Sequence, residues 1–260
     1  MKVEQCPQCG TIIPAGSDVC PICGYTLKKK TTDNSWRGIF ASIFARRRIL
    51  TMVLVFIFEI ALMFVITAIP MSFSQAKAIA GQTEPSLQAV RSLPILSRSV
   101  SIFSHNYEIA SIEIVPVIGQ IFFVISTYST AIVLDALAIG QGVPGPIALF
   151  TLLLLPYSWL ELPSYAIAAT EGGFLIASIF RKQFRVEIKR AVIVWLLVGI
   201  ELLTAGIFES WTIYLETSSN PFAIFITWIP YVIILAIFIT VVRSFLKRYE
   251  SSKSRERQQY

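Results

Sequence analysis

The sequence predicts an all-α polytopic membrane protein with a small cysteine-containing module at its N-terminus. Hydrophobic residues make up 55% of its 260 residues and charged residues only 15%, whereas about a quarter of a soluble chain is charged. The apolar residues form long runs, and 19 of the 22 Lys and Arg residues gather in residues 1–48, 181–190 and 243–260. This composition excludes an ordinary soluble enzyme, a disordered chain and a disulfide-rich secreted module.

The distribution of positive charge predicts the orientation of the chain in the membrane. Basic residues at the ends of apolar runs mark the cytoplasmic side, so we expect both termini and the 181–190 loop in the cytosol. A nucleic-acid-binding face would interleave basic and aromatic residues on one soluble surface, and the sequence lacks that pattern. The first apolar run begins near residue 49, which indicates a retained anchor in a multi-pass protein of the cell membrane.

All four cysteines lie in residues 1–27, with the spacing C-x2-C-x10-C-x2-C. They are Cys6, Cys9, Cys20 and Cys23. Two C-x-x-C turns complete a closed tetrahedral shell, which is typical of structural Zn²⁺, and the metal would supply about 10 kcal/mol or more of the folding free energy of so short an arm. Two disulfides and a redox C-x-x-C are the alternatives.

The arm resembles the short zinc ribbons that many archaeal proteins carry at their N-terminus, and the resemblance covers residues 4–27. It implies contacts with a macromolecular partner. Because no nucleic-acid-binding pattern is present, we expect a protein partner.

Residues 28–48 are predicted to form a basic linker followed by an amphipathic juxtamembrane helix. The apolar stripe consists of Trp36, Ile39, Phe40, Ile43 and Phe44, and Arg46, Arg47 and Arg48 follow it. Such a helix lies flat among lipid headgroups; a continuous lead-in to the first span is the alternative. In both cases the arginines face anionic lipid on the cytoplasmic side.

Residues 49–246 form the predicted transmembrane helical domain, and residues 247–260 a cytosolic basic tail. The full crossings are predicted at 49–69, 111–134, 191–215 and 222–242, each long enough to span a bilayer. Charged residues and prolines interrupt residues 71–107, which we expect to form short helices on the outer surface.

Two further apolar runs, 147–160 and 164–180, are short for a full crossing. A turn is predicted at 135–146. Because the basic clusters before and after the two runs lie on the same side of the membrane, the two runs together must enter the membrane and return. We expect two half-length helices that meet at a proline-rich break. Irregular backbone at membrane depth persists only where protein packs on it or water fills a cavity. The sequence therefore predicts about six hydrophobic helices, two of them short and broken, with a candidate site at 156–173.

Two segments resemble the stage II sporulation protein M family of integral membrane proteins. They are the stretch LPYSWLELP at 155–163 with the small residues after it, and IFSHN at 102–106. The matching positions are His105, Asn106, Pro156, Glu161 and Gly172; Tyr157 and Ser158 stand where the family pattern has His-Gly. The resemblance implies a non-catalytic membrane member of a protein complex.

Several glutamates lie within or beside the apolar runs, and no Lys or Arg lies in those runs to pair with them. Glu113 and Glu209 lie toward the outer half, and the candidate residues are Glu59, Glu161, Glu171 and Glu201. Because an ionised side chain is costly in the bilayer interior, three roles are open. The carboxyl groups can be protonated and bridge helices, face a wet cavity and carry protons or cations, or bind a partner helix.

The sequence carries no motif for catalysis. His105, the only histidine, excludes a two-histidine zinc protease motif and is expected to form hydrogen bonds at the outer surface. We therefore predict a non-enzymatic scaffold or complex-assembly component that contacts lipid, docks protein partners through its zinc ribbon and its transmembrane helices, and can form homo-oligomers. A permease subunit or proton- or ion-coupled transporter that uses the intramembrane glutamates is the alternative.

Overall fold

The computed structural model describes residues 3–14, 17, 19–25, 35–218, 220 and 222–258. The chain divides into two compact units, Met1–Ile39 and Phe40–Tyr260. Residues 28–34 of the predicted linker lie outside the described residues.

The N-terminal unit contains a two-stranded antiparallel sheet of β1 (Val3–Gln5) and β2 (Ile12–Pro14). Glu4 pairs with Ile13 at the centre of the sheet. The buried core of this sheet and of the cysteine turns consists of only Cys6, Ile13 and Cys20. So small a core cannot stabilise a fold without a crosslink or a metal.

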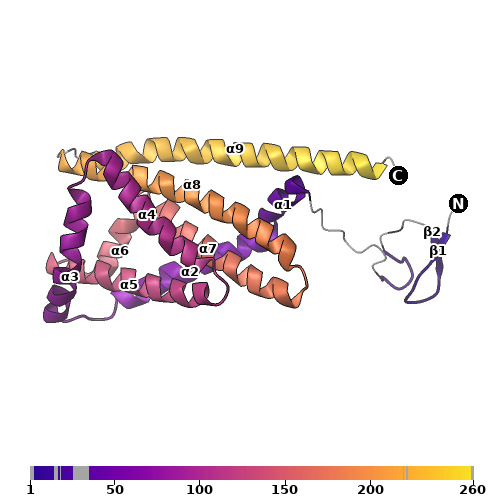
Figure 1. Cartoon of the computed structure of the whole chain (residues 1–260), viewed down its shortest axis with the longest axis horizontal. Coiled ribbons are helices and arrows are strands. Elements are labelled where there is room, and N and C mark those ends of the chain that lie inside the picture. Colours follow the sequence, from indigo (N-terminus) through magenta and orange to yellow (C-terminus); the bar gives the residue numbers. More distant parts are fainter. Residues whose placement is uncertain are drawn as a thin grey trace. The chain divides into compact units, whose positions relative to one another are not determined.

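Helices dominate the described part of the chain, as the composition predicts (Figure 1). They are α1 (Trp36–Ile43), α2 (Arg46–Thr67), α3 (Phe73–Arg91), α4 (Ile95–Glu113), α5 (Ile118–Gly140), α6 (Gly145–Leu153), α7 (Ser158–Phe180), α8 (Phe184–Thr217) and α9 (Ala223–Gln258). Five of them, α2, α5, α7, α8 and α9, are long and apolar enough to cross a membrane.

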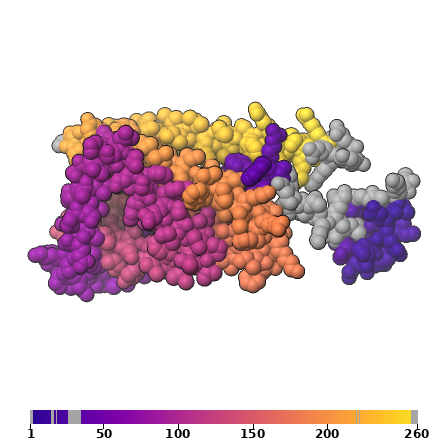
Figure 2. Space-filling model, viewed as in Figure 1, coloured from indigo at the N-terminus to yellow at the C-terminus, as the bar shows by residue number. Residues whose placement is uncertain are grey.

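The core of the helical unit forms where small residues allow close packing. Ala110 of α4 and Ala168 of α7 lie against Val198 and Leu202 of α8, and a second cluster joins Met63 of α2 to α5, α6 and α7. Helix α9 runs beside α8 at the edge of the unit, and α3 lies across one end of the long helices (Figures 1 and 2). Most side chains of α9 remain exposed, which suits a helix facing lipid.

Within the helical unit, Arg46–Arg48, the 181–190 segment and the part of α9 around Phe245 lie at one end. Arg48 at the start of α2 contacts Glu187 of α8, Arg190 donates a hydrogen bond to Ser42, and the ring of Phe245 in α9 lies 5.0 Å from that of Phe40. We expect this end to face the cytosol.

The turn between α5 and α6 lies at the opposite end of the unit. A Cβ atom on Gly145 would be 2.6 Å from the carbonyl oxygen of Thr67, the last residue of α2, and would overlap the Asp135 carboxylate. Only glycine fits there. The segment 135–146 therefore lies at the end away from Arg46–Arg48, not at the basic end that the sequence analysis requires.

The crossing predicted at 111–134 begins too early: the candidate span is α5, which begins at Ile118. Residues 71–107 are helical as predicted, but their helices are longer than expected. The chain breaks after Glu113 because Pro116 has no N–H for a helical hydrogen bond, and Val117 adopts a left-handed φ of 70°. The Gln120 side chain then accepts a hydrogen bond from the Val117 N–H at 2.8 Å. Helices α3 and α4 have 19 residues each, and α4 packs along α7 and α8.

The second half of the broken hairpin predicted at 147–180 is wrong, because helix α7 is continuous over 23 residues with Pro163 inside it. Only α6, with 9 residues, is short. The connection between α4 and α5 packs against Gly172 of α7. A Cβ atom on that glycine would lie 3.0 Å from the Ile114 carbonyl oxygen.

Gly172→Ala is expected to lower the free energy of unfolding by about 1–3 kcal/mol, as overpacking does. The added methyl group would collide with the Gln120 side chain and lie 3.2 Å from the Glu113 carbonyl oxygen. Gly173→Ala is the matched control, because nothing lies within 4 Å of its Cβ position, and alanine favours the helix by up to about 1 kcal/mol. Equal stability of both variants on SDS titration in mixed micelles would contradict the close hairpin contact.

Candidate functional site

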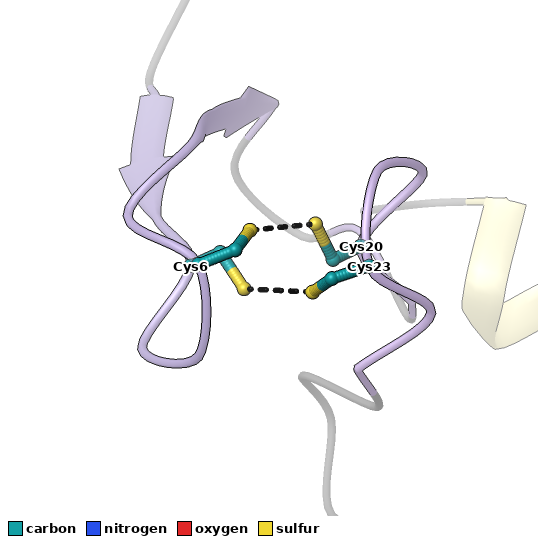
Figure 3. A group of neighbouring side chains, drawn as sticks. Cys6, Cys20 and Cys23 are labelled. Carbon is teal, nitrogen blue, oxygen red and sulfur yellow. Dashed lines mark hydrogen bonds between the residues drawn. The ribbon is translucent and has the colours of Figure 1, made fainter.

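The four cysteines converge on one point, as their spacing predicts (Figure 3). Their Sγ atoms all lie within 4.8 Å of one another, with separations of 3.7 Å for Cys6–Cys23 and for Cys9–Cys20. All four are free thiols, so the structure shows neither of the disulfides that the sequence leaves open. The group could hold a metal ion.

The two C-x-x-C turns have the same local geometry. The N–H of Gly10 donates to the Cys6 carbonyl and that of Gly24 donates to the Cys20 carbonyl, both at 2.9 Å. Gly10 and Gly24 have φ values of 73° and 71°, a conformation that side-chain-bearing residues rarely adopt. Each glycine thereby closes a turn that directs two thiols to one side.

Hydrogen bonds favour the thiolate form of two of these cysteines. The Thr11 side chain, 3.3 Å from Cys9 Sγ, and the Thr11 backbone lower the pKa of Cys9 to about 6. Backbone hydrogen bonds from Cys23 and Ile22 lower the pKa of Cys20. The thiolate is the form that binds a metal.

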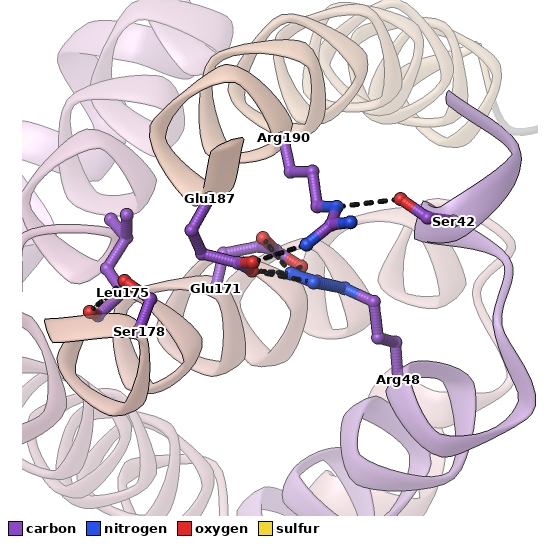
Figure 4. Close-up of polar contacts among 7 residues, drawn as sticks. All are labelled: Ser42, Arg48, Glu171, Leu175, Ser178, Glu187 and Arg190. Atoms are coloured by element: carbon purple, nitrogen blue, oxygen red, sulfur yellow. Dashed lines mark hydrogen bonds and ion pairs between the residues drawn. The ribbon is translucent and has the colours of Figure 1, made fainter. Parts of the chain in front are cut away.

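A buried ion-pair network lies at the basic end of the helical unit (Figure 4). Arg48 of α2 pairs with Glu171 of α7 at 2.9 Å and with Glu187 of α8, and Arg190 pairs with Glu187 at 2.6 Å and with Ser42 at 2.7 Å. Two guanidinium groups therefore balance two carboxylates. The network connects α2, α7 and α8.

This network corrects two expectations. Glu171 does have a basic partner, because the Arg48 side chain reaches across the bundle and donates a hydrogen bond to the Glu171 carboxylate. Arg48 lies just before the first apolar run. Arg48 is therefore buried instead of facing lipid, whereas Arg46 and Arg47 are exposed. The sequence analysis missed Glu187 and Arg190; their spacing of three residues on one helix is the signal that could have identified them as a pair.

Glu161 lies in a second polar group, closer to the other end of α7. Asn106 Nδ2 donates a 2.7 Å hydrogen bond to Glu161 Oε1, and the Glu161 carboxyl group also interacts with that of Glu209. The structure thus brings together two of the family-motif positions. Pro156, a third, is fully buried in the connection before α7.

The other predicted residues lie apart from these two groups. Glu201 lines an apolar cavity of about 330 Å³ among α2, α7, α8 and α9, and Glu59 lines a separate cavity of about 40 Å³. The four glutamates therefore do not form one site. His105 is exposed in the middle of α4, the helix that precedes the candidate span α5.

Comparison with known proteins identifies no relative of this chain: no protein-family model, no curated protein and no solved structure matches it. The resemblance to the stage II sporulation protein M family therefore stays a prediction.

Proposed function

We propose that the chain is a non-enzymatic membrane assembly component whose N-terminal module holds Zn²⁺ and docks a soluble protein partner on the cytoplasmic side. The observation that carries the proposal is a four-thiol module, compact in itself, that exposes apolar side chains. The helical unit would anchor this module at the membrane.

The geometry of the thiols supports zinc as the metal. Zn–S bonds of about 2.3 Å in a tetrahedron place neighbouring sulfur atoms about 3.8 Å apart. The separations of Cys6–Cys23 and Cys9–Cys20 are both 3.7 Å. Four thiolates leave no open coordination position, so the metal would stabilise the fold instead of taking part in a reaction.

The apolar surface of the module supports a protein partner. Val3 is 60% exposed, Ile12 70% and Ile22 71%. The register of the strands, with Val3 opposite Pro14 and Gln5 opposite Ile12, places Val3 and Ile12 on the same face of the sheet. Exposed apolar side chains gathered on so small a module are typical of an interaction surface.

Photo-crosslinking in intact cells tests the docking surface. A benzophenone amino acid placed at position 12 or 22 of the full-length chain is expected to crosslink to the same partner, identified by mass spectrometry. The same amino acid placed at Gln8, an exposed polar position of the first cysteine turn, is expected to crosslink at least about tenfold less. Position 8 lies outside the proposed apolar contact with the partner.

The metal-ligand variant Cys20→Ser provides the control for folding of the module. It is expected to abolish both crosslinks without changing the amount of protein in the membrane. Crosslinking that is equal at positions 8, 12 and 22, or that persists in Cys20→Ser, would contradict docking through a folded zinc module.

A further inference from the structure

A small cavity lies inside the helical unit among α2, α4, α5 and α7. Its volume is about 40 Å³, which is enough for one ion and a water molecule. The oxygen-bearing side chains that line it are Glu59, Ser126, Thr127, Thr130 and Tyr165. Its remaining lining is apolar, and it contains no basic residue.

Glu59 is the residue in this cavity that needs a partner. It is 2% exposed, and its Oε2 atom has no hydrogen-bond partner within the described part of the chain. A carboxylate left unpaired in the membrane interior is strongly destabilising. The cavity in front of it is therefore the place where a compensating group would bind.

Neighbouring Glu113 does not compete for that group. The Ser126 hydroxyl lies 3.0 Å from the Phe123 carbonyl oxygen and 2.8 Å from Glu113 Oε1. Ser126 donates to one oxygen of the Glu113 carboxyl group, and Glu113 does not line the cavity. Glu59 is therefore the one carboxyl group among the described residues that faces this space.

We propose that Glu59, together with Thr127 and Tyr165, binds one Na⁺ ion in this cavity. Carboxylate and hydroxyl oxygens are ligands for hard cations, and a single carboxylate balances a single positive charge. The small volume favours sodium over larger alkali ions. The inference goes beyond the proposed assembly role and does not depend on it.

Sodium titration of the purified full-length protein in detergent tests this site. In choline chloride at constant ionic strength, added NaCl is expected to raise the melting temperature saturably by several °C, while KCl does not. Direct binding of ²²Na⁺ in a scintillation assay is expected to fall at least about tenfold in Glu59→Gln. Thr127→Val, which keeps the side-chain shape and removes the hydroxyl, is expected to weaken binding about tenfold.

Glu201→Gln is the matched control, because it neutralises a carboxyl group that lines the other cavity. It is expected to keep the sodium-dependent shift and the binding of ²²Na⁺. The proposal is overturned if the unmodified protein shows no sodium-specific shift, if Glu59→Gln binds sodium as well as the unmodified protein does, or if acidification alone reproduces the full stabilisation without sodium. Should Glu59→Gln fail to fold, Thr127→Val decides by the same readouts.

Discussion

Removal of the metal is expected to unfold residues 3–25 and to leave the helical unit folded. The buried cluster of the described strands and cysteine turns consists of Cys6, Ile13 and Cys20, so zinc would supply about 10 kcal/mol or more of the folding free energy of this module. Hydrogen–deuterium exchange with mass spectrometry, before and after treatment with a zinc chelator, measures this. Peptides of β1 and β2 are expected to lose protection, while those of α7 and α8 keep it.

Metal analysis of the purified protein provides the matching control. One zinc ion per chain is expected in the untreated protein, and none in Cys20→Ser, whose exchange is expected to equal that of the chelated sample. Persistent protection of the strands after complete loss of the metal would show that the module folds without zinc. Protein purified without any metal would contradict the zinc assignment.

Arg48→Leu is expected to lower the free energy of unfolding of the helical unit by about 3–5 kcal/mol. Removal of one partner from a buried ion pair leaves an uncompensated charge, which lowers the free energy of unfolding by about this amount. In this variant Glu171 loses its only ion pair among the described residues, while Glu187 keeps Arg190. SDS titration in mixed micelles measures the change.

Two variants separate this effect from a general loss of positive charge. Arg47→Leu removes an exposed guanidinium next in sequence and is expected to change the free energy of unfolding by less than about 0.5 kcal/mol. The double variant Arg48→Leu/Glu171→Gln is expected to recover more than half of the loss, because the orphaned carboxylate is gone. No recovery would show that Arg48 acts through packing on Phe174, 4.2 Å from its ring, and not through its charge.

The features that the sequence predicted correctly depend on local pattern. The spacing of Cys6, Cys9, Cys20 and Cys23 is short enough that two turns bring the thiols together. The apolar runs predicted at 49–69, 191–215 and 222–242 lie almost wholly within α2, α8 and α9. Within the helical unit, Arg46–Arg48 and the 181–190 segment lie at one end, because Lys and Arg are costly inside apolar runs.

The features that the sequence analysis missed depend on which helices meet. Pro116 lies in the break between helices α4 and α5, whereas Pro163 lies inside the continuous helix α7. A hydropathy pattern does not distinguish these two prolines. At Gly119 and Gly172 the backbone of the α4–α5 turn packs too closely for a side chain. A hydropathy pattern contains no information on such contacts.

The amino-acid sequence by itself determined that this is a helical chain with long apolar segments and a four-cysteine module, because hydropathy and short-range spacing are properties of local segments. The tertiary structure alone decided which buried charges are compensated. Arg48 reaches Glu171 across 123 positions of the chain, and Glu59 faces a hydroxyl-lined cavity that four separate helices build. Compensation of a buried charge depends on distance in space, and distance along the chain does not predict it.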